Sequence, residues 1–198
     1  MPRNEQTKTE HAPIQVLDAH VADLIAAGEV VERPASVVKE LVENAIDAGA
    51  SAVTIEIQRG GMALIRVTDN GSGIPAGQCR TAFLRHATSK LHTAQDLDAI
   101  GTLGFRGEAL AAIASVSRVE LITRTAEETL GNSLTLEGGE ILEEEPAGCP
   151  LGTTMVVRDL FYNTPARLKF MKRDAAEGAA VFALVQKLAL SHPEVSIK

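Results

Sequence analysis

The chain has 198 residues, with 19 Lys and Arg against 26 Asp and Glu, which gives a formal net charge of -7. This acidic balance, together with 3% aromatic residues and no Trp, argues against a general basic nucleic-acid binder. A hydrophobic share of 45% is ordinary for a globular protein and excludes wholesale disorder, so we expect one folded domain.

The two cysteines, Cys79 and Cys149, form no Cys-x-x-Cys motif, which argues against a disulfide framework or a structural zinc site and favours a reducing compartment. Every apolar stretch is far shorter than the roughly 20 residues that span a bilayer. Residues 1–13 are polar and lack the apolar core of a signal peptide. We therefore predict a cytoplasmic protein with no membrane partner, a flexible tail over residues 1–13 and a folded domain over residues 14–198.

Helical spacing of apolar residues begins at Asp18 and is interrupted by Gly28. Pro34 suits the first turn of a second helix, which Gly49 is placed to end. This second helix carries one apolar stripe that predicts a core-facing side: Val37, Val38, Leu41, Val42, Ala45 and Ile46.

Alternating patterns over residues 53–58 and 63–68, joined by a Gly60-Gly61 turn, predict a hairpin. A helix is expected over residues 79–86. The remaining elements expected along the chain are a helix over 108–115, strands over 118–124, 133–137 and 153–158, and a helix over 174–191. Helices and antiparallel strands are segregated, which predicts an α+β sandwich with helices over one face of a sheet.

Charge is uneven in the second half. Residues 125–157 hold seven Glu and no Lys or Arg, and we expect these glutamates on exposed hairpin tips. A basic stretch follows, which is either an ordinary charged surface or a local contact for nucleic acid or a partner: Arg158, Arg167, Lys169, Lys172 and Arg173.

Polar residues at helical spacing follow Pro34: Glu40, Glu43, Asn44 and Asp47. Taken alone, this pattern is usually a solvated helix face. Asn44, however, is a poor mid-helix residue whose side-chain carbonyl is a hard oxygen ligand for a metal. Glu40 is placed to take a proton from a metal-polarised water.

Two glycine-containing turns suit a ligand. Asp69-Asn70-Gly71-Ser72-Gly73 follows the end of a strand, where Asp69 can accept a hydrogen bond from the exocyclic amino group of a purine. Residues 101–107 precede a helix and suit an anionic phosphate, although no Walker A motif occurs. Thr88-Ser89-Lys90 could add hydroxyls and a cation near that phosphate. The alternatives are a ligand-free turn, a loop without function and a solvated lysine.

Residues 40–48, 69–73 and 101–107 together resemble, in order and setting, the motifs of the GHKL ATPase superfamily of gyrase-type topoisomerases, chaperones and histidine kinases. Within it the chain is most similar to the MutL family of DNA mismatch repair proteins. The strings that carry this resemblance are IAAGEVVERP over 25–34, RHATSK over 85–90, GFRGEAL over 104–110 and FYNTPAR over 161–167.

The resemblance implies a GHKL (Bergerat) two-layer sandwich, with helices over one face of a mixed, mostly antiparallel sheet. It makes Glu40 the general base, Asn44 the Mg²⁺ ligand and Asp69 the reader of the adenine amino group. Further ATP-binding residues implied are Asp47, Gly71, Gly73, Thr88, Ser89, Lys90, Gly104, Phe105, Arg106, Gly107, Thr153 and Thr154.

The resemblance also implies a slow, Mg²⁺-dependent ATPase whose nucleotide state drives homodimerisation and so couples mismatch recognition to downstream repair proteins, with DNA reached through a longer protein. A second domain of that longer protein supplies a lysine to the phosphates in the family, and this chain would end near its start. Hydrolysis by these residues alone therefore stays open. The alternatives are a nucleotide-binding module of another GHKL protein, gyrase-type or chaperone-type, and a binding-only module without turnover.

Overall fold

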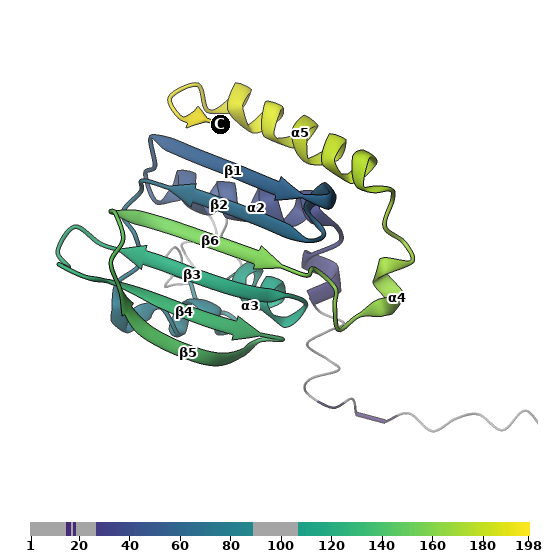
Figure 1. Ribbon diagram of the computed structural model, residues 1–198, viewed down its shortest axis with the longest axis horizontal. Coiled ribbons are helices and arrows are strands. Elements are labelled where there is room, and N and C mark those ends of the chain that lie inside the picture. Colours follow the sequence, from purple (N-terminus) through teal and green to yellow (C-terminus); the bar gives the residue numbers. More distant parts are fainter. Residues whose placement is uncertain (1–14, 17, 19–26, 89–106) are drawn as a thin grey trace, which may run out of the picture.

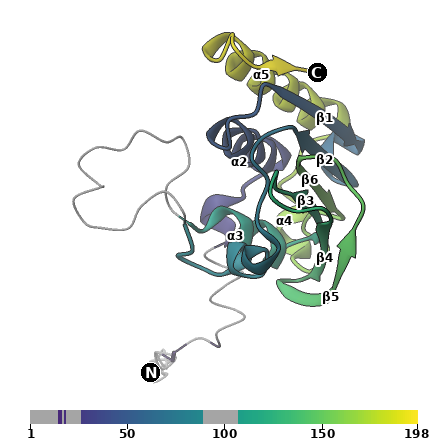
Figure 2. The same ribbon diagram turned by 90° about the vertical axis from the view of Figure 1, so that its left-hand side faces the viewer.

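The computed structural model describes residues 15, 16, 18, 27–88 and 107–198. Seven strands form one sheet in the order β5-β4-β3-β6-β2-β1-β7. Adjacent strands are antiparallel except β1 and β7, which run parallel. Helices α2 and α3 lie over one face of this sheet (Figures 1 and 2), which confirms the predicted α+β sandwich with a mixed, mostly antiparallel sheet.

The strands are β1 (Ala52–Gln58), β2 (Leu64–Asp69), β3 (Arg118–Arg124), β4 (Gly131–Glu137), β5 (Glu140–Ala147), β6 (Gly152–Arg158) and β7 (Ser196–Ile197). The α-helices with complete bounds are α2 (Pro34–Asp47), α3 (Ala109–Ser115), α4 (Pro165–Leu168) and α5 (Asp174–Ser191). The described residues also include three short 3₁₀ turns, η1 (Arg59–Gly61), η2 (Ala76–Gln78) and η3 (Thr81–Phe83). Residues 27–30 are α-helical, so the expected interruption at Gly28 is wrong. The expected tail over residues 1–13 lies outside the described residues.

Helix α2 begins as predicted, because Pro34 occupies its first turn after the extended Arg33. Gly49, with φ of +73°, follows its end. The predicted apolar stripe packs on the sheet and forms the centre of the core together with side chains of β2, β3 and β4. The fully buried side chains at this centre include Val37, Val38, Val42, Ile65, Leu121 and Leu134.

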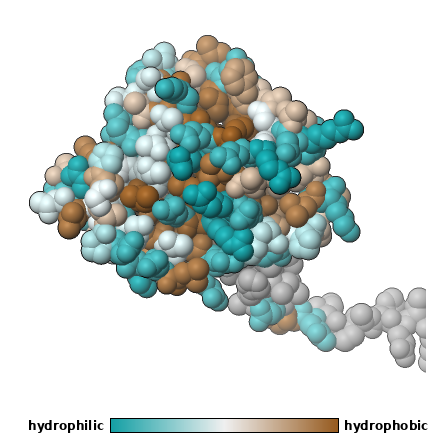
Figure 3. Space-filling model, in the orientation of Figure 1, coloured by the Kyte–Doolittle hydropathy of each residue, from teal (hydrophilic) through white to brown (hydrophobic). Residues whose placement is uncertain are grey.

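Helix α5 lies at the side of the molecule next to α2 and β1 (Figures 1 and 2). The sheet face opposite α2 and α3 carries charged pairs such as Arg66 with Glu56, 2.9 Å apart, and Arg118 with Glu137, 3.0 Å apart. Figure 3 shows hydrophilic and hydrophobic residues mixed on this face. Within the described part of the chain, no helix is long and apolar enough to cross a membrane.

The prediction of a helix over residues 79–86 is wrong, because this segment forms the 3₁₀ turn η3 with irregular flanks. His86 has φ of +60°, which an α-helix does not accept. Cys79 is buried whereas Leu84 is 60% exposed, so these apolar residues do not share one buried face. The expectation that the glutamates of residues 125–157 lie on hairpin tips missed β5, an edge strand that carries Glu143, Glu144 and Glu145 and whose residues are exposed or half-buried on both faces of the sheet.

Replacing Leu121 by Ala should lower the free energy of unfolding by about 2–5 kcal/mol, since this side chain is fully buried on β3. The matched control is Leu142→Ala on β5, where the side chain is 62% exposed and the expected loss is within about 0.5 kcal/mol. Urea denaturation of both variants measures the difference. Equal losses would contradict this description of the core.

Candidate functional site

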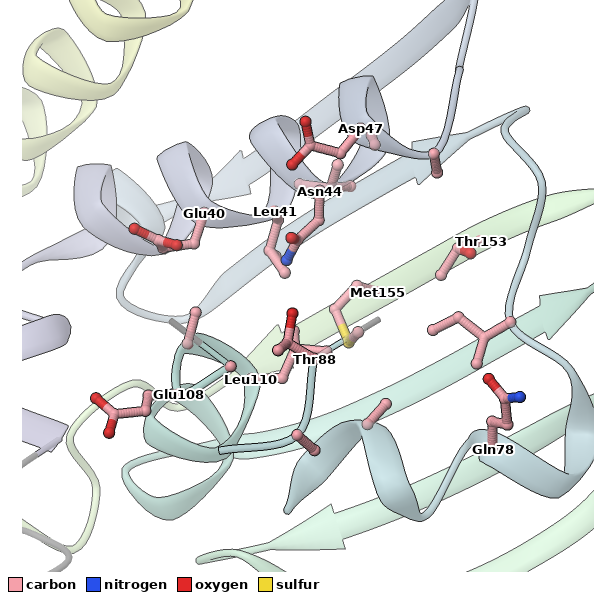
Figure 4. Close-up of a pocket in the computed structure, with 18 of the residues that line it drawn as sticks. Glu40, Leu41, Asn44, Asp47, Gln78, Thr88, Glu108, Leu110, Thr153 and Met155 are labelled. Carbon is pink, nitrogen blue, oxygen red and sulfur yellow. The ribbon is translucent and has the colours of Figure 1, made fainter. Parts of the chain in front are cut away.

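A cleft of about 1160 Å³ opens between α2, α3 and the sheet (Figure 4). Its walls come from α2, the turn after β2, the segment around η2 and η3, the start of α3, and β6. The structure brings eight of the predicted site residues together here: Glu40, Asn44, Asp47, Asp69, Gly73, Thr88, Gly107 and Thr153.

Helix α2 supplies a carboxylate and an amide to the cleft. The side chain of Asn44 projects into the cavity toward Thr88, and Glu40 lies one helical turn earlier (Figure 4). Lys39 lies 3.6 Å from Glu40 Oε1 and 2.8 Å from Glu43 Oε2. Burial acts to lower the pKa of Lys39, but its contacts with Glu43 and Glu40 raise it overall. This end of the cleft therefore combines acidic side chains with a nearby cation that stays charged.

Glu43 shows where helical spacing alone misleads. It shares the spacing of Glu40 and Asn44, yet its side chain is only 8% exposed and does not line the cleft. Its carboxylate accepts a hydrogen bond from Lys39 instead. Among the polar residues of α2, Glu40, Asn44 and Asp47 line the cleft, whereas Glu43 is buried and pairs with the half-exposed Lys39.

Asp69 lies at the end of β2, where its Oδ1 accepts hydrogen bonds from the amides of Gly71 at 2.8 Å and Thr153 at 3.3 Å. Burial raises the pKa of the Asp69 carboxyl, and these two amide hydrogen bonds act in the opposite direction. Both of these amides approach Oδ1, and a carboxylate has two acceptor oxygens, so Asp69, which lines the cleft, can accept a further hydrogen bond through Oδ2.

Two predicted residues do not line the cleft. The amide of Gly71 donates a hydrogen bond to the Asp69 carboxylate, but Gly71 itself does not line the cleft. Thr154 lies on the opposite face of the sheet, where its hydroxyl is 3.1 Å from that of Thr68. The expectation that Thr154 contacts a ligand is therefore corrected, because successive residues of a strand point to opposite faces.

Five other predicted residues lie outside the described residues: Ser89, Lys90, Gly104, Phe105 and Arg106. Their assignment as nucleotide-binding residues stays a prediction. Gly107, the last glycine of that stretch, does line the cleft and precedes α3.

Sequence reasoning missed several polar residues of the cleft. Glu108 lines it and lies 3.2 Å from His86, which also lines it. Gln78 lies at the same end as Thr153, whereas Glu108 lies at the end of Glu40 (Figure 4). The position of Glu108 directly after the glycine-rich stretch was the available signal, whereas nothing in the local sequence marks Gln78.

Arg167, from the basic stretch, is not a freely solvated cation. Its Nη1 donates a hydrogen bond of 3.0 Å to the carbonyl of Val31, and its guanidinium lies 5.8 Å from the centroid of Phe161. It fills the space next to Gly28, where a Cβ would lie 1.4 Å from Nη2. Arg167 therefore contacts Gly28 and Val31, the residues on either side of Glu29 and Val30, which line the cleft.

Comparison with known proteins adds independent information. Residues 32–147 match the model of the family described as "Histidine kinase-, DNA gyrase B-, and HSP90-like ATPase". The chain is 56% identical to the DNA mismatch repair protein MutL of Agathobacter rectalis, over 93% of this chain and 28% of that protein. It is 55% identical to MutL of Symbiobacterium thermophilum, over 94% of this chain and 29% of that protein. The chain thus spans less than a third of the length of these relatives.

Solved structures agree in fold. The chain superposes on the "Aquifex aeolicus MutL ATPase domain complexed with ADP" with a TM-score of 0.66 and 39% identity, over 85% of this chain and 59% of that one. A second structure, the "N terminal domain of a DNA repair protein", gives a TM-score of 0.74 and 29% identity, over 89% of this chain and 50% of that one.

Replacing Gly152 by Ala should lower the free energy of unfolding by about 2–4 kcal/mol. Its φ is +112°, and a Cβ would lie 2.2 Å from the carbonyl oxygen of Asp69. The matched control is Gly148→Ala, where no atom lies within 4 Å of the added Cβ, and the expected change is within about 0.5 kcal/mol. Urea denaturation compares the two, and a neutral Gly152→Ala would contradict the close approach of β6 to the end of β2.

Proposed function

The chain belongs to the family of histidine kinase-, DNA gyrase B- and HSP90-like ATPases, and we propose that its cleft binds ATP with Mg²⁺ and hydrolyses the terminal phosphate. The observation that supports this proposal is the chemical difference between the two ends of the cleft. Glu40 and Asn44 lie on α2 toward one end, whereas Asp69 and Thr153 meet on adjacent strands at the other. A nucleotide needs two such different ends, one for the base and one for the phosphates.

At the base end, Asp69 offers a carboxylate oxygen to the exocyclic amino group of adenine. Gly73 lines this end of the cleft in the turn after β2, where its φ of +73° and the Arg124 carbonyl, 2.2 Å from the position of a Cβ, leave room only for glycine, and in this proposal its backbone lies against the base. Thr153 adds a hydroxyl from β6.

At the phosphate end, Glu40 acts as the general base that accepts a proton from the attacking water. Asn44 is the side-chain ligand for Mg²⁺, which supplies positive charge to offset the negative charge that develops on the phosphate oxygens. In the described part of the chain, no group of three or more His, Cys, Asp or Glu residues could hold a metal by itself. This donor set fits Mg²⁺, which is commonly held by one or two side chains together with phosphate oxygens.

Thr88 and Gly107 belong to the phosphate side in this proposal, and Asp47 supports the cleft from α2. The predicted residues beyond the described ranges would complete the phosphate site. They are Ser89, Lys90, Gly104, Phe105 and Arg106.

At the level of the whole protein, we propose the ATP-dependent region of a DNA mismatch repair protein of the MutL type. The supporting observation is the identity of about 55% to MutL proteins over more than 90% of this chain. Nucleotide binding would then drive homodimerisation in the cytoplasm and regulate contacts with mismatch-recognition proteins, downstream repair proteins and DNA through the longer protein. A gyrase-type or chaperone-type protein is a weaker proposal, because the relatives reported above are mismatch repair proteins.

Replacing Glu40 by Ala should reduce ATP turnover by roughly 100-fold or more while the Kd for ATP changes only a few-fold, since a general base acts in the chemical step. Release of labelled phosphate measures turnover, and calorimetry measures binding.

Asn44→Ala should remove the strengthening of ATP binding by Mg²⁺. Glu56→Ala, on the opposite face of the sheet, is the control for both the Glu40 and the Asn44 variants. Binding unaffected by Mg²⁺ and by Asn44→Ala would mean that the site is assigned wrongly, whereas binding without turnover by the unaltered chain would leave a binding-only module.

Replacing Asp69 by Asn should weaken ATP by about 10-fold or more relative to GTP, because a carboxylate that accepts from the adenine amino group becomes an amide. Competition binding with both nucleotides gives this ratio. An equal loss for ATP and GTP would count against the reading of adenine by Asp69.

A further inference from the structure

Thr123, on β3, lies behind the base end of the cleft and does not line it. It is 1% exposed, and its hydroxyl oxygen has three close polar neighbours. The amide nitrogen of Ile74 lies at 2.8 Å, the carbonyl oxygen of Gly152 at 3.1 Å and the hydroxyl oxygen of Thr153 at 3.1 Å. Since Ile74 and Thr153 both line the cleft, one buried hydroxyl joins two of its walls.

Only one arrangement of protons satisfies all three contacts. The amide of Ile74 can only donate and the carbonyl of Gly152 can only accept, so Thr123 accepts from the first and donates its single proton to the second. The hydroxyl of Thr153 must then donate to Thr123. Thr123 Oγ1 thereby makes one donated and two accepted hydrogen bonds, which is the full capacity of a hydroxyl.

This arrangement decides what Thr153 offers a ligand. With its proton directed at Thr123, the hydroxyl of Thr153 presents only lone pairs to the cleft. Asp69, whose Oδ1 accepts from the amide of Thr153 at 3.3 Å, adds a second acceptor on the neighbouring strand. Two acceptors side by side favour an amino group on the ligand and disfavour a carbonyl, because a carbonyl facing two acceptors has no hydrogen-bond partner.

We propose that Thr123 is a positioning residue that holds the Thr153 hydroxyl as an acceptor and thereby lets the cleft distinguish a 6-amino purine nucleotide from a 6-oxo purine nucleotide. This inference rests on the proposed function, since it requires a purine nucleotide in the cleft. It goes beyond that function by assigning part of the base specificity to a residue that does not line the cleft.

The test compares the Kd of ATP with that of ITP, in which a carbonyl replaces the amino group, for the unaltered chain, Thr123→Val and Thr123→Ser. Valine keeps the shape of threonine but leaves the Thr153 proton free to turn toward the ligand. Thr123→Val should therefore reduce the preference for ATP over ITP by about 3–10-fold, the range expected for one hydrogen bond. Thr123→Ser keeps the hydroxyl and should keep the preference.

Thr123→Val also leaves the Ile74 amide without its acceptor, so Thr123→Cys is the second variant. Cysteine has the shape of the serine variant, but its sulfur is a weaker acceptor than a hydroxyl, so the ATP preference should fall relative to Thr123→Ser. An unchanged ratio of the two Kd values in Thr123→Val or Thr123→Cys, with both nucleotides weakened equally, would overturn the proposal and leave Thr123 a structural residue. Failure of the unaltered chain to bind either nucleotide would instead contradict the proposed function.

Discussion

The packing of one face of α2 on the sheet is the constraint on which the cleft depends. Burial of a Val or Leu side chain stabilises a fold by about 1.5–3 kcal/mol, and α2 buries several, among them Val38 and Leu41. Because an α-helix repeats every 3.6 residues, this burial sets the rotation of the helix about its axis. Apolar packing therefore orients Asn44 and Glu40 toward the cleft, and the free energy that orients them comes from buried apolar residues.

The second constraint is the register of β2 with β6. Val67 pairs with Met155 and Thr68 with Thr154, which brings Asp69 beside the start of β6. Alternation then directs Thr153 to the cleft and Thr154 to the opposite face. A slip of one residue would exchange the two threonines, so the close approach of Gly152 to Asp69 helps to define the site as well as the sheet.

Periodicity predicted the elements whose apolar residues repeat regularly. The bounds of β3 and α5 agree with the predicted ranges, and α2 begins and ends as Pro34 and Gly49 indicate. Periodicity did not predict β5, because the residues of this edge strand are exposed or half-buried and do not alternate between apolar and polar. It also failed for the segment after Cys79, where no single face is buried.

The residues of the candidate site also divide into those that the sequence predicted and those that it did not. Local spacing was enough to select Asn44 and Asp69, and the family resemblance added Thr153. Contacts between distant segments were not available from the sequence. The hydrogen bond from Ile74 to Thr123 joins residues 49 positions apart, and it depends on strand order, which no local pattern encodes. The contact of Arg167 with Val31 escaped prediction for the same reason.

The contact between Gly28 and Arg167 also restricts which sequences this fold can accept. The guanidinium occupies the position that a Cβ at residue 28 would take, so a larger residue there displaces the arginine head from Val31 and from Phe161. The two positions are 139 residues apart in the chain, yet a side chain added at residue 28 changes the contacts that Arg167 makes. Changes at residues 28 and 167 should be tolerated as a pair, with a shorter side chain at one position accompanying a longer one at the other.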